Sequence, residues 1–346
     1  MKLTDIPLFL SRMRTDRAVR QELAYKKMLP HSDEVNWPAR RACLLGLQFD
    51  RCPEDRDLIL YLLDQEICAR QGSGGCGSSL QAVVFFAAEL GDPSILWRIM
   101  SAKFANFDTG IVIDREAIYC CGVERTLAVL AASDHPARDR FLPAPAQADV
   151  DKWWTHQRSA FPDRWEDETD KIGTCEEIGD FEAGAEYLRK ELAEKLATVA
   201  PGSTEEQKLL VDARHQWGFL GRADEAARLQ AKLDAFLPAA PWDRASALRD
   251  ALTVYTAASQ FPEAASKVEP LRAALAQVDS WRTVGLGRMS AMAMADLAIA
   301  TPDKAAAARV FSILKEMMAG GLEAPPALKK SWAHCRGGSK ARLGTR

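Results

Sequence analysis

Three stretches in the second half of this 346-residue chain resemble one another and follow at intervals of about 40 residues. They read GDFEAGAEYL from Gly179, GRADEAARLQ from Gly221 and SQFPEAASKV from Ser259, and a fourth, ATPDKAAAARVF, begins near Ala300. Each has a small residue, a short turn and an acidic residue beside alanine, between two helical segments. One helical hairpin cannot bury its apolar face alone, so hairpins repeated with this period stack on their neighbours. The repeat therefore predicts an all-α chain of stacked antiparallel helical hairpins.

The best-defined unit, LVDARHQWGFLGRADEAARLQAKLDAFLP, resembles the tetratricopeptide (TPR) family, whose unit is two antiparallel helices. Trp217 takes the place of the large aromatic residue on the first helix, and Gly221 matches the glycine of the tight turn. Ala226 matches the small residue where the helices cross, and Pro238 the proline that closes the unit. The resemblance implies a TPR-like α-solenoid.

The next unit repeats this pattern with one exchange. Tyr255 and Ala264 occupy the aromatic and small positions, while Ser259 replaces the turn glycine. The resemblance covers residues 171–320 and, more weakly, residues 78–142. The period exceeds the family's usual repeat of about 34 residues, so other types of α-solenoid stay open.

Helical spacing of apolar residues also marks the segments 55–70, 78–90 and 181–199. In contrast, the β-branched run inside TGIVIDREAIYC (109–120) predicts a single strand or an extended loop. Composition suggests a linker at PAPAQADVD, followed by several tryptophans without clear periodicity. We therefore expect an N-terminal helical part (1–145), a Trp-rich linker segment (146–170), TPR-like repeats (171–320) and a C-terminal tail (321–346).

The net charge and the spacing of cysteines and histidines exclude several classes of partner. The net charge is -3 and the pI is about 6.0, which predicts no binding of nucleic acid or of anionic membranes. The 8 cysteines form no C-x-x-C and the 5 histidines no H-x-x-x-H, so we expect no metal site and no cofactor. No membrane span or signal peptide is recognisable, and the expected location is cytoplasmic. The oligomeric state is left open.

Two smaller features have a structural and a functional interpretation. Cys120 and Cys121 are adjacent, and neighbouring cysteines rarely bridge each other because the geometry is strained. A reactive thiol there would need a nearby histidine or cation. AMAMADLAIA contains Met292 and Met294, which predict a close-packed core helix in preference to a methionine-rich docking face.

The stretch QGSGGCGSS (71–79) carries two nucleotide-binding patterns. Gly72, Gly74 and Gly77 spell G-x-G-x-x-G, and Gly72–Ser79 spell a phosphate loop in which Ser78 replaces the lysine. The dinucleotide pattern needs a strand before its first glycine, but here a helix precedes it. The favoured interpretation is a flexible connection between helices. The alternative is a nucleotide- or anion-binding enzyme that uses Gly74, Gly77, Ser78 and Ser79 at the free N-terminus of the next helix.

The predicted function follows from the architecture. Solenoids curve and expose a long groove that holds a peptide or a protein partner. We expect exposed residues of the first helix of each hairpin to line it, with tryptophans as anchors, namely Arg214, His215, Gln216, Arg249, Asp250, Trp153, Trp154 and Trp165. The tryptophans could instead fill the joint between the two helical parts. The leading hypothesis is a non-enzymatic interaction module without catalytic residues. One version is a bacterial immunity or regulatory protein that sequesters one partner.

Overall fold

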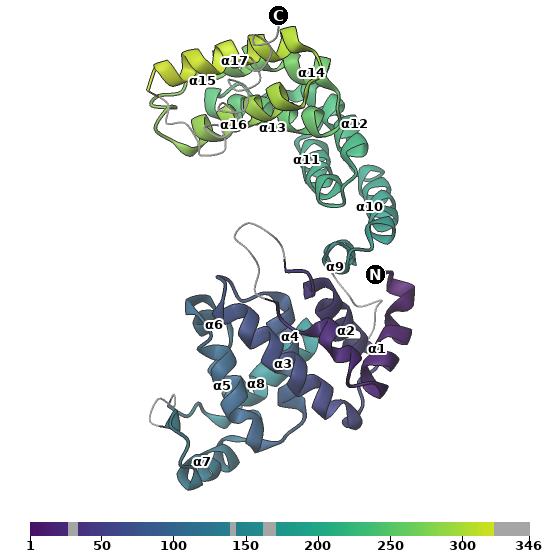
Figure 1. Ribbon diagram of the computed structural model, residues 1–346, viewed down its shortest axis with the longest axis vertical. Helices are drawn as coiled ribbons and strands as arrows, with labels where there is room; N and C mark the ends of the chain where they lie inside the picture. Colours follow the sequence, from purple (N-terminus) through teal and green to yellow (C-terminus); the bar gives the residue numbers. More distant parts are fainter. Residues whose placement is uncertain (27–33, 139–142, 162–170, 322–346) are drawn as a thin grey trace, which may run out of the picture. The chain divides into compact units, whose positions relative to one another are not determined.

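The computed structural model describes residues 1–26, 34–138, 143–161 and 171–321, and Figure 1 shows its course. Regular structure in these ranges is helical, without any strand, which confirms the predicted all-α class. The chain divides into two compact units, unit 1 (Met1–Gly184) and unit 2 (Ala185–Arg346). The part boundaries expected at 145 and 170 stay predictions. Across the described ranges, no helix combines the length and the apolar character that a membrane span requires.

Unit 1 is a bundle of nine helices within the described ranges, joined by short 3-10 segments. Their bounds are α1 (Ile6–Thr15), α2 (Trp37–Phe49), α3 (Arg56–Gln71), α4 (Ser78–Glu89), α5 (Leu96–Lys103), α6 (Phe107–Val112), α7 (Val123–Ala132), α8 (Gln147–Ala160) and α9 (Lys171–Ile178). The most apolar of them, α4, packs against α2, α3 and α5 and buries Phe85 and Phe86. A helix that is apolar nearly all round is stable only when several neighbours cover it, and α4 supplies the centre of this core.

The segment 109–120 folds differently from the prediction of a strand or an extended loop. It contributes to the short helix α6 and then to the 3-10 segment Arg115–Tyr119. The side chain of Asn106 accepts a hydrogen bond from the Thr109 amide, and the Thr109 hydroxyl accepts one from the Asn106 amide. This reciprocal cap starts a helix although the β-branched residues favour a strand. The capping hydrogen bonds outweigh the weak strand preference of these residues.

Unit 2 is a succession of helices in which each packs against the next. After α10 (Phe181–Leu196), which begins in unit 1 and lies mainly in unit 2, come α11 (Thr204–Phe219), α12 (Ala223–Leu233), α13 (Pro241–Ala257), α14 (Phe261–Ser266), α15 (Val268–Leu275), α16 (Gly285–Ala300) and α17 (Lys304–Ala319). Helix α11 packs on α12, α12 on α13, α13 on α14, α15 and α16, and α16 on α17 (Figure 1). The first helices of successive hairpins are therefore α11, α13 and α16.

Three of the four turns of the sequence repeat share one backbone geometry, whereas the fourth ends α16 at Thr301 with extended backbone. Gly179, Gly221 and Ser259 have φ values of 78°, 68° and 58°, in the left-handed region. At each turn the next amide donates to a carbonyl five residues earlier, in the pairs Asp180 to Cys175, Arg222 to Trp217 and Gln260 to Tyr255. These are the bonds of the Schellman motif, which ends a helix at a residue that glycine occupies with least strain. The sequence repeat is thus a repeat of helix endings.

The aromatic and small positions of the repeat lie in the core of unit 2. Trp217 and Tyr255 are buried, and so are Ala226 and Ala264. The Tyr255 hydroxyl also donates to Asp234 Oδ2 at 2.8 Å, and burial raises the pKa of this phenol, with Asp234 adding to the shift. A small side chain lets two helix backbones approach closely, while the large aromatic fills the space beside the contact.

Candidate functional site

Five of the predicted binding residues meet where α11 lies beside α13 or line the cavity next to that place. Arg214 on α11 donates from Nη2 to Asp250 Oδ2 on α13 at 3.2 Å and lies 2.9 Å from His215 Nε2. It also donates from Nη1 to Gln230 Oε1 on α12 at 2.6 Å. Arg249 donates from Nη2 to Asp250 Oδ1 at 2.6 Å. We call Arg214, His215, Gln230, Arg249 and Asp250 the α11–α13 cluster.

The charges of this cluster do not balance. Two guanidinium groups, Arg214 and Arg249, share the single carboxylate of Asp250. An arginine cannot accept a hydrogen bond, so His215 Nε2 is the acceptor of its contact with Arg214 Nη2. The cluster therefore carries one surplus positive charge. Arg249 keeps 18% of its side chain exposed, and the surplus can act on a group outside the chain.

Arg214 is buried, with only 4% of its surface exposed, so the expectation that it is an exposed groove residue is wrong. Its Nε atom is buried and has no hydrogen-bond partner among the described residues. Burying a guanidinium is costly unless it is paired, and three of its neighbours supply that pairing. Arg214 accordingly holds α11, α12 and α13 together, while His215 stays exposed and Gln216, Arg249 and Asp250 are half-buried.

A cavity of about 350 Å³ lies between α10 and α11 beside the cluster. Its apolar wall consists of Leu188, Leu192, Leu209 and Ala213, and its polar rim of Glu191, Lys195, Asp212, His215 and Gln216. Glu191 and Lys195 form an ion pair along α10. A cavity with this volume and a mixed lining is at the small end of ligand sites and suits an apolar group with a polar end.

The first helix of the next hairpin continues the same surface. Arg249 Nη1 on α13 lies 3.6 Å from Met289 Sδ on α16. Met289 and Met292 are 51% and 44% exposed, whereas Met294 is fully buried in the core of unit 2. The prediction of a core helix therefore holds for Met294, and Met292 belongs to an open face. We define the first-helix face as His215, Arg249, Asp250, Met289 and Met292.

The predicted tryptophan anchors lie elsewhere. Trp153 and Trp154 are on the regular helix α8 in unit 1, so the expectation of an irregular segment is wrong at these positions. Trp153 is buried and its ring centroid lies 4.9 Å from that of Trp154. Trp154 in turn meets Phe85 edge-on at 5.9 Å. Both rings contribute to the core of unit 1, while Trp165 lies outside the described residues.

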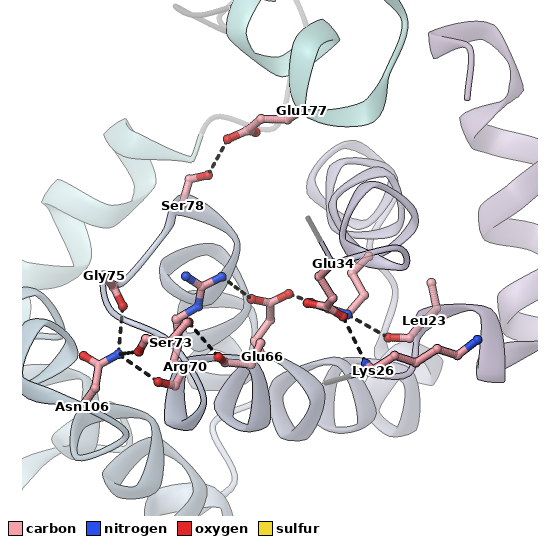
Figure 2. A network of polar contacts seen from close by, with 12 residues as sticks. Leu23, Lys26, Glu34, Glu66, Arg70, Ser73, Gly75, Ser78, Asn106 and Glu177 are labelled. Carbon is pink, nitrogen blue, oxygen red and sulfur yellow. Dashed lines mark hydrogen bonds and ion pairs between the residues drawn. The ribbon is translucent and has the colours of Figure 1, made fainter. Parts of the chain in front are cut away.

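The glycine-rich loop is fastened from within (Figure 2). The Asn106 side-chain amide donates to the carbonyls of Arg70, Ser73 and Gly75, each at 3.0 Å. The Gly75 amide donates to Asp108 Oδ2 at 2.7 Å. The loop joins α3 to α4, as expected of a connection between helices. These bonds fasten its first half, while its flexibility stays a prediction.

Carboxylates of the chain itself occupy the places that a phosphate would need. Ser78 Oγ, at the first position of α4, donates to Glu177 Oε1 at 3.1 Å, as Figure 2 shows. Asp108 accepts from the Gly75 amide and lies 3.8 Å from the Cβ position of Gly74. The hydroxyl of Ser79 is buried and has no hydrogen-bond partner among the described residues. Arg70 lies 3.4 Å from the Cβ position of Gly77 and pairs with buried Glu66 at 3.8 Å, and Arg41 pairs with Glu177. A phosphate here would face two acidic side chains and find both arginines already paired.

Sequence reasoning missed Gln230 and Met289, although Gln230 follows Ala226 by one helical turn on the buried face of α12. In the described parts of the chain, no group of three or more His, Cys, Asp or Glu side chains could hold a metal ion.

Comparisons with protein-family models, with curated proteins and with solved structures found no match to this chain.

Proposed function

We propose that unit 2 is a TPR-like α-solenoid that binds a peptide segment of a protein partner along the first-helix face, without catalysing a reaction. The observation that carries the proposal is the line of side-chain contacts from Arg214 on α11 to Asp250 on α13, and from Arg249 on α13 to Met289 on α16. These contacts link the first helices of three successive hairpins, and the exposed or half-buried residues beside them make up the first-helix face. Such faces are the surfaces on which helical-repeat proteins bind extended partners.

The chemistry of the face indicates the kind of segment that would bind. Arg249 donates from Nε and Nη2 to Asp250, so a carboxylate on the partner would pair with the remaining N–H groups of Nη1 and Nη2. The surplus guanidinium charge favours such a carboxylate. The exposed thioethers of Met289 and Met292 favour an apolar side chain beside that carboxylate, since methionine adapts to irregular apolar shapes. The cavity next to His215 would take a second apolar side chain.

A peptide library selected on the purified protein tests this proposal. We expect enriched peptides that carry Asp or Glu next to Met, Leu or Ile. Arg249→Glu should reduce affinity for an enriched peptide at least about tenfold, or about 1.4 kcal/mol, because like charges then face each other. The matched control is Arg228→Glu on the second helix α12, where the side chain is 71% exposed, and its affinity should match the wild type. Equal affinities for both variants would place the binding site elsewhere.

One version of this function is a regulatory or immunity protein that sequesters its partner. Tight binding of a single partner would support this version. The alternative function, nucleotide or anion binding at the glycine loop, is disfavoured by Asp108 and Glu177, which use the donors that a phosphate would need. Titration calorimetry with ATP, GTP and NAD should give no binding heat. Saturable heat that Gly74→Ala abolishes would restore the alternative.

A further inference from the structure

Cys120 and Cys121 form a pair of close thiols in unit 1. Their Sγ atoms lie 3.8 Å apart, and one thiol donates a hydrogen bond to the other. Both side chains are partly exposed, in contrast to Cys43, Cys76 and Cys175, which are buried. The pair occupies the turn between the 3-10 segment Arg115–Tyr119 and α7, and Gly122 follows it with φ 92°. A small oxidant can therefore reach two adjacent sulfur atoms.

The surroundings distinguish the two thiols. The hydrogen bond with Cys120 lowers the pKa of Cys121, and the cation of Arg125 adds to this effect. The same bond, together with burial, raises the pKa of Cys120. The thiolate is the reactive form of cysteine, so Cys121 is the nucleophile of the pair and Cys120 the neighbour that can react next. An accessible thiolate beside a second thiol is typical of oxidation-sensing cysteines.

We propose that Cys120–Cys121 is an oxidative modification site, at which a peroxide converts the two thiols into a reversible disulfide between adjacent residues. The Cys121 thiolate attacks one oxygen of the peroxide, the O–O bond breaks, and Cys121 sulfenic acid forms. The leaving hydroxide (or alkoxide) takes up the proton that the Cys121 thiol had released and becomes water (or alcohol). The Cys120 sulfur then attacks the Cys121 sulfur. The S–O bond breaks, the S–S bond forms, and the oxygen leaves as water with the Cys120 proton. Two thiols lose two electrons, and one peroxide gains them.

The strain of such a ring makes the modification reversible. A disulfide between neighbouring residues departs from relaxed geometry, and strained disulfides are the more easily reduced, labile ones. The adjacent Gly122 begins α7, and its neighbour Val123 donates its amide to Gln147 Oε1 at 3.1 Å. Closing the ring requires a backbone change in this turn, so oxidation should loosen the start of α7.

Peptide mass spectrometry after mild treatment with hydrogen peroxide tests the proposal. Trypsin releases Glu116–Arg125, which contains both cysteines, and this peptide should lose the mass of two hydrogen atoms and regain it with a dithiol reductant. Its oxidation should be about tenfold faster than that of Cys68, the exposed control thiol. Amide hydrogen exchange in Val123–Ala132 should rise in the oxidised protein.

Two serine variants separate the roles of the thiols. Cys120→Ser should accumulate a sulfenic acid at Cys121 that a dimedone probe labels, whereas Cys121→Ser should leave Cys120 unlabelled at the same peroxide concentration. Circular dichroism of both variants confirms that they are folded. Faster labelling of Cys68, equal labelling of the two variants, or a disulfide between chains in place of the one within Glu116–Arg125 would overturn the proposal.

Discussion

Unit 1 and unit 2 use their arginine side chains in opposite ways. In unit 1, Arg40 is fully buried and donates to Glu66 and Glu34, so one guanidinium faces two carboxylates. In unit 2, Asp250 faces two guanidinium groups, and one of them belongs to the partly exposed Arg249. Charge is thus satisfied internally in the unit 1 network, whereas unit 2 keeps a surplus near its surface. The glycine-rich loop of unit 1 is thus held by side chains of the same unit, and we propose the binding site on the first-helix face of unit 2.

The largest effect should come from breaking the internal network of unit 1. Glu66 is fully buried and accepts from Arg40 Nε at 2.7 Å. Glu66→Ala leaves a buried guanidinium short of a partner, so the free energy of unfolding should fall by about 3–5 kcal/mol. Urea denaturation measures this loss. Arg228→Ala, on the surface of unit 2, is the control and should change the same quantity by less than about 0.5 kcal/mol. A similar small change for both variants would remove the contrast between the units.

Two methionines of α16 differ in burial, so replacing them should change the stability of unit 2 by different amounts. Met294 is fully buried, so Met294→Ala should lower the free energy of unfolding by about 2–5 kcal/mol through a cavity and lost apolar contact. Met292 is 44% exposed, and Met292→Ala should leave stability within about 0.5 kcal/mol of the wild type. Thermal and urea unfolding compare the two. The open face would be misassigned if Met292→Ala were the more destabilising change.

A smaller effect is expected at the glycine loop. Asn106→Ala removes the donor of three carbonyl groups, and unpaired backbone carbonyls cost about 1–3 kcal/mol in total where they are buried. Amide hydrogen exchange in residues 71–79 should become faster, while affinity for a library-selected peptide should not change. Unchanged exchange would show that Asn106 does not hold the loop.

The smallest effect concerns acid stability in unit 1. The Arg56 guanidinium and the Ser94 amide hold the pKa of Asp92 at about 2, below the ordinary value for aspartate. A carboxylate with a depressed pKa stabilises the fold above its unfolded pKa of about 3.9, and this contribution disappears as the pH falls toward 2. Both partners are substantially exposed, so the effect should stay below about 1 kcal/mol. Urea unfolding should show Asp92→Asn destabilised at pH 6 and equal to the wild type near pH 2. A constant difference would point to a cause other than ionisation.

Much of the fold could be predicted from local sequence patterns. The turns at Gly179, Gly221 and Ser259 are readable because a left-handed helix ending depends on one residue and its nearest neighbours. The helices α3, α4 and α10 are readable for the same reason, since apolar spacing and caps act within a few residues. The run 109–120 misled the prediction because β-branched residues favour strands only weakly, and the cap at Asn106 decided otherwise.

The sequence by itself determined the all-α class, the repeated helix endings and the cluster of polar residues on the first helices. Tertiary structure alone decided that Arg214 is buried while Arg249 stays near the surface, and that Met292 faces outward while Met294 fills the core. It alone brought Asn106 and Glu177 to the glycine loop. The difference lies in how far apart in the sequence the interacting residues are. Helices and turns follow from hydrogen bonds between near neighbours, but burial and charge pairing depend on residues tens of positions apart, whose proximity only packing establishes.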